Sequence, residues 1–283
     1  MVKRPSLPRR LSGFLLAFGF FALFPACNLD LVGFFASSEP DERFEARDTF
    51  HFLSRAERNL ILPPEYSFIV VSDTHIEERN TRGLEKIRDA ASAGKDAFTV
   101  VTGDITQNGR REDLKKFIEI ASSLRAIGVP CYPVIGNHDV YFNNWPNWRD
   151  LIGSSTYRVG GPGSSTTLFI LDSANASFGK DQIDWLKEGL KSAGPRVFIF
   201  THTNPFTEVI SDREQITDNR ERARLFSLLD GRCDALFSGH VHNRIVRKAG
   251  RVTYISLEDY RDHRSYCRVY VKPSGISWEF KRL

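Results

Sequence analysis

The alternation of short apolar runs with amphipathic segments, from Tyr66 onward, most constrains what this chain can fold into. The apolar runs are rich in Val, Ile and Phe and nearly continuous, as strands buried on both faces are. The segments between them carry apolar residues every three or four positions, which predicts helices. The pattern therefore predicts an α/β fold. The predicted strands are residues 67–71, 97–102, 131–135, 167–171, 196–201 and 235–237, and the predicted helices are residues 82–93, 111–127, 181–193 and 220–229.

After His242 the helical spacing stops and the pattern changes. Apolar and polar residues alternate there, which is typical of strands with one buried face. We therefore expect antiparallel strands to close the domain at its C-terminus. They are predicted at residues 244–248, 252–257, 266–271 and 276–280.

The ends of the predicted strands carry side chains that bind metal ions, and five of the seven histidines lie there. The segments are Ser72-Asp73-Thr74-His75, Gly103-Asp104, Gly136-Asn137-His138-Asp139, Thr201-His202 and Ser238-Gly239-His240-Val241-His242. Taken singly, such an Asp is more often a helix cap and such a His more often a hydrogen-bonded structural residue. Together they indicate a metal site, because ligands gather where strands of an α/β sheet end. Mixed O and N ligands suit Mn, Fe or Zn, and a carboxylate can bridge two ions.

Two bridged ions ~3.5–4 Å apart can generate hydroxide from water and hold the oxygens of a phosphoryl group. The ordered segments also resemble the five motifs of the calcineurin-like metallophosphoesterase family and span about 170 residues. The resemblance implies a metallophosphoesterase-type β-sandwich flanked by helices, and hydrolysis of a small phosphoester.

The same resemblance implies the role of each motif residue. Asp73, His75 and His242 would hold one divalent ion. Asn137, His202 and His240 would hold the other, and Asp104 would bridge the two. His138 would be catalytic and face the scissile phosphate without holding metal, with Asp139 as its orienting neighbour.

The residues at positions 107 and 108, shortly after the bridging aspartate, narrow the class of substrate. Gln107 and Asn108 stand where Ser/Thr protein phosphatases have an Asp-Arg pair whose arginine grips phosphate. Purple acid phosphatases place a metal-binding tyrosine at the position of Gln107. The chain therefore resembles the broad bacterial group that includes phosphodiesterases. Asn108, Arg110 and Arg111 are candidate substrate contacts, although arginines that open a helix are usually solvated surface charge.

A cluster of aromatic residues follows His138. It contains Tyr141, Phe142, Trp145 and Trp148. Such a cluster can form an aromatic rim that stacks a base or sugar, or it can pack the core of a short helix. The second interpretation is the favoured one.

The N-terminal leader has a basic start, an apolar run over residues 11–26, and then Cys27. This order predicts a secretory signal peptide over residues 1–26, with an uncleaved anchor helix as the alternative. Cys27 follows Ala26 as the lipid-modified cysteine of a bacterial lipoprotein does. We therefore expect an exported, membrane-anchored protein at the periplasmic face or the cell surface. Residues 27–64 are predicted to be a tether, and residues 65–283 the catalytic domain.

The net charge of +4 belongs to the leader, which holds four basic residues and no acidic one. Without it, 35 basic residues balance 35 acidic ones, so the sequence shows no track for a nucleic-acid backbone. A nuclease and a non-catalytic surface lipoprotein that uses the fold as a binding scaffold remain the alternative functions. The other cysteines, Cys131, Cys233 and Cys267, lie in or next to apolar runs and are predicted to be free thiols.

Overall fold

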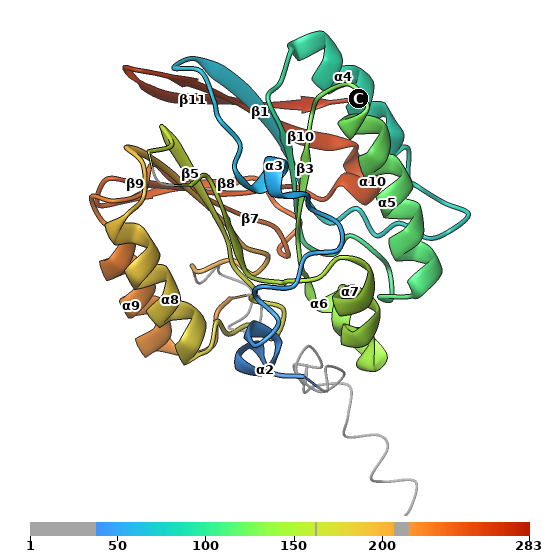
Figure 1. Cartoon of the computed structure of the whole chain (residues 1–283), viewed down its shortest axis with the longest axis horizontal. Coiled ribbons are helices and arrows are strands. Elements are labelled where there is room, and N and C mark those ends of the chain that lie inside the picture. Colours follow the sequence, from blue (N-terminus) through green and yellow to red (C-terminus); the bar gives the residue numbers. More distant parts are fainter. Residues whose placement is uncertain (1–37, 162, 207–214) are drawn as a thin grey trace, which may run out of the picture. The chain divides into compact units, whose positions relative to one another are not determined.

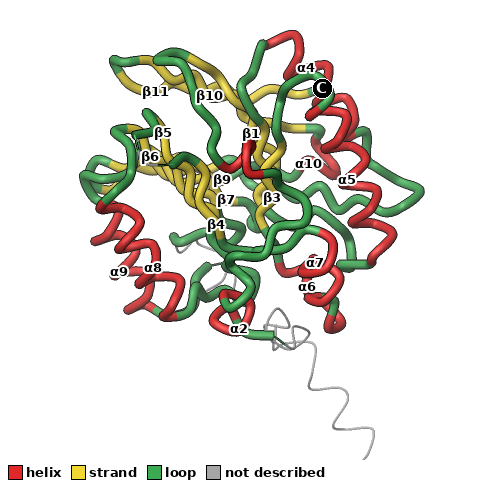
Figure 2. Tube along the Cα trace, in the orientation of Figure 1, coloured by secondary structure: helices red, strands yellow, loops and turns green. Residues whose placement is uncertain are grey.

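The structure is a computed structural model that describes residues 38–161, 163–206 and 215–283. The predicted signal peptide, Cys27 and the first part of the predicted tether lie outside the described residues. Two β-sheets face each other, and helices cover their outer sides (Figure 1). Figure 2 shows the strands in yellow between the two groups of helices in red. The predicted α/β sandwich is therefore confirmed.

The first sheet has the strand order β11-β10-β1-β2-β3. Its parallel strands are β1 (Tyr66–Val71), β2 (Thr99–Thr102) and β3 (Cys131–Val134). The antiparallel strands β10 (Ser265–Lys272) and β11 (Gly275–Arg282) extend it on the other side of β1. The connections hold η1 (Leu84–Lys86), α4 (Ile87–Gly94) and α5 (Arg111–Arg125), and after β3 come α6 (Asn137–Val140), η2 (Tyr141–Asn143) and α7 (Trp145–Leu151).

The second sheet has the strand order β4-β5-β6-β7-β9-β8. Four neighbouring strands are parallel: β5 (Thr166–Ile170), β6 (Arg196–Phe200), β7 (Ala235–Ser238) and β9 (Val252–Ser256). The antiparallel edge strands are β4 (Tyr157–Val159) and β8 (Ile245–Ala249). The helices α8 (Lys180–Lys191) and α9 (Asn219–Leu229) lie along this sheet (Figure 1).

Aromatic side chains fill the space between the sheets. Phe68 of β1 stacks on Phe98 with ring centroids 4.5 Å apart. It also meets Phe198 and Phe237 of the second sheet edge-on, at 5.2 and 5.9 Å. All four rings are fully buried, and each stabilises the fold by roughly 1.5–3 kcal/mol through burial. This core holds the two sheets together and places their strand ends beside each other.

The observed strands and the longer helices agree with the predicted ones, and several short elements come in addition. All six predicted parallel-type strands are present within two residues of their predicted ends, and antiparallel strands close the C-terminus. β9 pairs with β8 in antiparallel fashion, but it also continues the parallel sheet beside β7. The sequence pattern does not predict β4, which has only three residues, nor the short helix α10 (Tyr260–His263).

Residues 38–64, within the predicted tether, contain α2 (Pro40–Phe44) and α3 (Arg55–Arg58). Arg43 is fully buried and donates from Nε and Nη2 to the two carboxylate oxygens of Asp172, at 2.7 and 2.8 Å. Phe52 and Leu62 belong to the main hydrophobic core. These residues therefore pack against the catalytic domain, while the predicted domain boundaries stay a prediction.

Two further observations concern the cysteines and the membrane. Cys131, Cys233 and Cys267 are buried and free, as predicted. Among the described residues, none of the helices combines the length and apolar character that a membrane crossing requires.

Candidate metal centre

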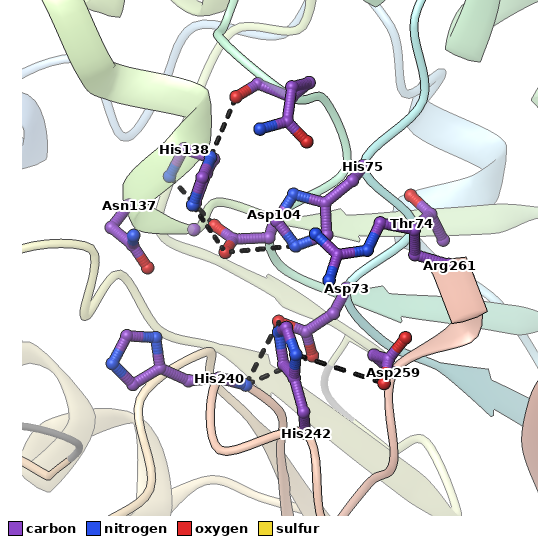
Figure 3. Close-up of polar contacts among 12 residues, drawn as sticks. Asp73, Thr74, His75, Asp104, Asn137, His138, His240, His242, Asp259 and Arg261 are labelled. Atoms are coloured by element: carbon purple, nitrogen blue, oxygen red, sulfur yellow. Dashed lines mark hydrogen bonds and ion pairs between the residues drawn. The ribbon is translucent and has the colours of Figure 1, made fainter. Parts of the chain in front are cut away.

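The loops that follow β1, β2 and β3 of the first sheet meet those that follow β6 and β7 of the second. Figure 3 shows side chains that follow β1, β2, β3 and β7 gathered at one place. Six of the seven predicted metal ligands lie on these loops, and Asn137 opens α6 directly after one of them; the other six are Asp73, His75, Asp104, His202, His240 and His242. The carboxyl ends of parallel strands thus bring together residues from both sheets.

Asp73, His75 and His242 form the first group of candidate ligands. One ligand atom from each lies within 4.8 Å of the others. Nε2 of His242 is 3.3 Å from Oδ1 of Asp73. The geometry matches the set predicted to hold the first ion.

Asp104, His202 and His240 form a second group with the same spacing. Nε2 of His202 lies 3.3 Å from Oδ1 of Asp104 and 3.2 Å from Nδ1 of His240. Oδ1 of Asn137 adds an oxygen 2.9 Å from the same Nε2. These are the residues predicted to hold the second ion.

Asp104 lies between the two groups. Its Oδ1 faces His202, and its Oδ2 lies 3.7 Å from Nε2 of His75. His75, Asp104 and His138 form a third overlapping group, so distance alone does not separate His138 from the ligands. The position of Asp104 suits a carboxylate that serves two ions at once.

The ring of His75 tests whether these residues fit a metal ion. Both of its nitrogens are buried and lack a hydrogen-bond partner among the described residues. Leaving a buried polar group unpaired is costly, so buried nitrogens normally have a partner. Burial also lowers the pKa of His75, and that of His240, to about 4. Both rings are therefore neutral near pH 7, as metal ligands must be.

The charge of Asp104 favours a proton on His202 when no metal ion is bound. Burial lowers the pKa of His202, but the carboxylate of Asp104 outweighs it and raises this pKa to about 9. Burial acts to raise the pKa of Asp104, but the charge of His202 holds it well below its usual value. A divalent ion bound here would replace this proton, because a metal ligand histidine is neutral.

The backbone of the ligand loops is strained. Five of the seven predicted ligands have positive φ in the left-handed region: Asp73, His75, Asp104, His240 and His242. Such conformations cost about 1–3 kcal/mol each in residues other than glycine and gather at functional sites. Close packing around the loops holds them, since a Cβ on Gly239 would collide with the side chains of Ser72 and Asp73.

Asp259 supports the first ligand group from outside. Its Oδ2 lies 2.8 Å from Nδ1 of His263 and 3.9 Å from Nδ1 of His242. Carboxylates in this position orient a ligand histidine and raise its basicity. Sequence reasoning misses both Asp259 and His263, because neither lies in one of the five segments that resemble the family motifs.

His138, the predicted catalytic histidine, lies beside Asp104. Its Nδ1 is 2.8 Å from the carbonyl oxygen of Gln107, and its Nε2 is 3.9 Å from Oδ2 of Asp104. Because a carbonyl only accepts, Nδ1 carries a hydrogen. The orienting contact thus comes from the backbone of Gln107, which sequence reasoning does not single out for this role.

Asp139, the predicted orienting neighbour of His138, holds the loops after β2 and β3 together. Its carboxylate accepts hydrogen bonds from the backbone NH groups of Ile105, Thr106 and Gly136 and from the Thr106 hydroxyl. Burial and the nearby charge of Asp104 raise the pKa of Asp139 to about 6. Its contacts are those of a support for the loops, and its catalytic role stays a prediction.

The predicted substrate contacts lie at the start of α5. Arg110 and Arg111 are exposed, and Asn108 is half-buried. Their contact with substrate stays a prediction. In the aromatic cluster, Trp145 and Trp148 are buried as core residues, whereas Phe142 is 63% exposed.

These groups are candidate ligand sets for divalent ions, and Asp104 lies between them. The profile of the calcineurin-like phosphoesterases matches residues 66–244. The chain belongs to the calcineurin-like metallophosphoesterase family and is a phosphoester hydrolase.

One relative by sequence is a probable glycerophosphodiester phosphodiesterase, GpdQ, of Arcobacter nitrofigilis. It is 28% identical over 202 residues, which cover 62% of this chain and 71% of the relative. Among solved structures, a dimetal phosphatase from Danio rerio is 16% identical with a TM-score of 0.58, over 77% of this chain and 96% of that one. The purple acid phosphatase PPD1 of yellow lupin is 11% identical with a TM-score of 0.60, over 78% of this chain and 52% of that one. The two solved structures share the fold.

Proposed function

We propose that this protein is a dinuclear metal-dependent phosphodiesterase that acts on a small diester. The observation that carries the proposal is Asp104, which lies between the two ligand groups with Oδ1 3.3 Å from His202 and Oδ2 3.7 Å from His75, and so suits a paired site. The diester preference is supported by Gln107 and Asn108, which replace the phosphate-gripping pair of the protein phosphatases. The printed name of the relative, a probable glycerophosphodiester phosphodiesterase, points the same way.

The donor set favours Mn, Fe or Zn as the native ions. When bound, two such ions supply Lewis-acid polarisation of the phosphoryl group and lower the pKa of water. Asp73, His75 and His242 would hold one ion, and Asn137, His202 and His240 the other. Asp104 would contact both.

His138 would give a proton to the leaving oxygen. Because Nδ1 is held by the Gln107 carbonyl, the proton must come from Nε2. Its Nε2 lies 3.9 Å from Oδ2 of Asp104, which places this nitrogen beside the candidate metal centre. A positioned acid of this kind contributes roughly 10²–10⁴-fold to the rate.

A panel of esters tests the proposed activity. The full-length protein is assayed with alkyl and aryl phosphomonoesters and diesters, including a glycerophosphodiester, after loading with Mn, Fe, Zn or Mg. Chelator-treated protein is the control. Diesters should be hydrolysed with the higher kcat/KM. Faster hydrolysis of every monoester than of every diester would remove the diester assignment and leave the family activity standing.

We also propose that the protein is exported and held at a membrane through lipid on Cys27. A single acyl chain binds a membrane only marginally, so stable attachment needs the several chains of a bacterial lipoprotein. The full chain expressed in a bacterium should fractionate with membranes, and Cys27→Ser should change its processing. A Cys27→Ser protein that matures normally and stays in the membrane fraction would favour the uncleaved anchor.

A further inference from the structure

The helix α10 carries Arg261, which belongs to none of the sequence motifs, and holds it next to the candidate metal centre. The backbone NH of Tyr260 donates to the carbonyl of Ser72 at 2.8 Å, and that of Arg261 donates to the carbonyl of Asp73 at 3.1 Å. Two consecutive residues of α10 are thus fixed to the loop that carries the first ligand group. The position of Arg261 relative to Asp73 follows from this anchoring.

The side chain of Arg261 extends over the candidate metal centre. Figure 3 shows it running from α10 toward Asp73 and His75. Burial is the main reason why the pKa of His75 is low, and the nearby charge of Arg261 adds a small part. The side chain is 29% exposed, so its guanidinium meets both the ligand residues and solvent.

Arg261 contacts the carboxylate of Asp262 and can bind a further anion as well. Nε and Nη2 lie 3.0 and 2.9 Å from Oδ2 of Asp262, which is itself 59% exposed. This solvent-facing pair is weak, because water screens it. A guanidinium has five donors in a planar fork that matches the oxygens of a phosphate.

Electrostatic repulsion favours the binding of an anion between the candidate metal centre and Arg261. Two divalent ions in the ligand groups would repel the guanidinium of Arg261. An anionic group that lies between the ions and the guanidinium removes this repulsion and is attracted by both. The phosphoryl group of a substrate or product is such an anion, and its oxygens accept the hydrogen bonds that Arg261 donates.

We propose that Arg261 binds a non-bridging oxygen of the phosphoryl group that the metal centre processes. This inference rests on the proposed function and names the side chain that recognises its substrate. Arg110 and Arg111, two of the contacts expected from the sequence, lie at the start of α5 instead. Arg261 would favour phosphate and phosphomonoester products as well, because their greater charge strengthens the interaction.

Binding of inorganic phosphate to the metal-loaded full-length protein, measured by calorimetry, tests the proposal. Arg261→Ala should weaken binding about 10- to 100-fold, the worth of a charge-assisted hydrogen bond. Arg261→Lys should recover part of the loss, since it keeps the charge without the fork. Asp262→Asn should bind phosphate as tightly as the wild type or more tightly.

Arg149→Ala is the matched control. Arg149 also bonds to the next residue, Asp150, through Nε and Nη2, at 3.0 and 2.9 Å, but on α7. Its loss should leave phosphate binding unchanged. In steady-state kinetics on a diester, Arg261→Ala should lower kcat/KM by a similar factor while metal analysis returns the wild-type ion content.

Three outcomes would overturn the proposal. Wild-type phosphate affinity in Arg261→Ala would refute it, and if that variant still hydrolysed esters the proposed function would stand. An equal loss of phosphate affinity in Asp262→Asn would show that the Arg261–Asp262 ion pair acts by holding the structure. An equal loss in Arg149→Ala would show a general effect of surface charge. If the wild type hydrolyses no ester, the proposed function fails, and phosphate binding still reports on Arg261.

Discussion

Replacement of Asp104 by asparagine tests whether one carboxylate serves both ions. Oδ1 of Asp104 accepts the backbone NH of His138 at 2.9 Å and lies 3.3 Å from His202, while Oδ2 faces His75 at 3.7 Å. Asparagine has nearly the same shape and can keep the bond from His138. It has no negative charge, and one of its two terminal atoms becomes an NH₂ donor that cannot bind metal.

The size of the effect follows from the number of ions that each residue contacts. Loss of an outer partner of a metal ligand already costs about 10- to 100-fold in metal affinity. Asp104→Asn would remove the anionic ligand that we propose both ions share, so we expect at least about 100-fold weaker binding of each ion. His242→Ala removes a neutral ligand from one group and should weaken mainly one ion.

Metal analysis by mass spectrometry, after dialysis against a series of buffered Mn²⁺ concentrations, measures both losses. The wild type should retain two ions per chain, since the predicted ligands are too many for one site with an open position. Circular dichroism of each variant checks that it is folded. Equal losses at Asp104 and His242, or a single ion in the wild type, would refute the shared carboxylate.

Three further predictions concern catalysis, stability and pH. His138→Ala should keep both ions and lower turnover by roughly 10²–10⁴. Alkyl esters should lose more activity than aryl esters, because an aryl oxide leaving group departs without a proton. Equal losses for both ester types would mean that His138 stabilises charge on the phosphoryl group instead. Arg43→Met leaves the buried carboxylate of Asp172 unpaired and should lower the free energy of unfolding by about 3–5 kcal/mol, and urea denaturation that finds a loss below about 1 kcal/mol would contradict the buried pair. Because the pKa of His202 is raised from 6.5 to about 9, its protonation stabilises the metal-free fold fully below pH 6.5, and this contribution is lost as pH rises through about 9. A metal ion must displace that proton, so metal affinity should rise up to about tenfold per pH unit between pH 7 and 9; calorimetry that finds a flat affinity would count against it.

Much of the fold was predictable because its strands are buried on both faces. Segments such as β1 and β6 are nearly all apolar, and a following polar cluster marks where each one ends. β4 escaped prediction because it has three residues with Arg158 in the middle. α10 escaped because four residues show no helical period.

The sequence by itself determined which residues stand at the strand ends. Asp73 and His75 must follow β1, and His240 and His242 must follow β7, because these short motifs are continuous with the strands. The ordered motifs were enough to identify the family and to predict both ligand sets. No longer-range information was needed for that step.

Only the tertiary structure decided which of these ends meet and what surrounds them. His202 reaches Asp104 from the other sheet, 98 positions along the chain, because aromatic packing aligns the two sheets. Asp259 and Arg261 join the site because β10 returns beside β1 and brings α10 with it. Local periodicity reports which face of an element is buried, but it carries no information about which distant element covers that face. Contacts of this kind form only when the whole core closes.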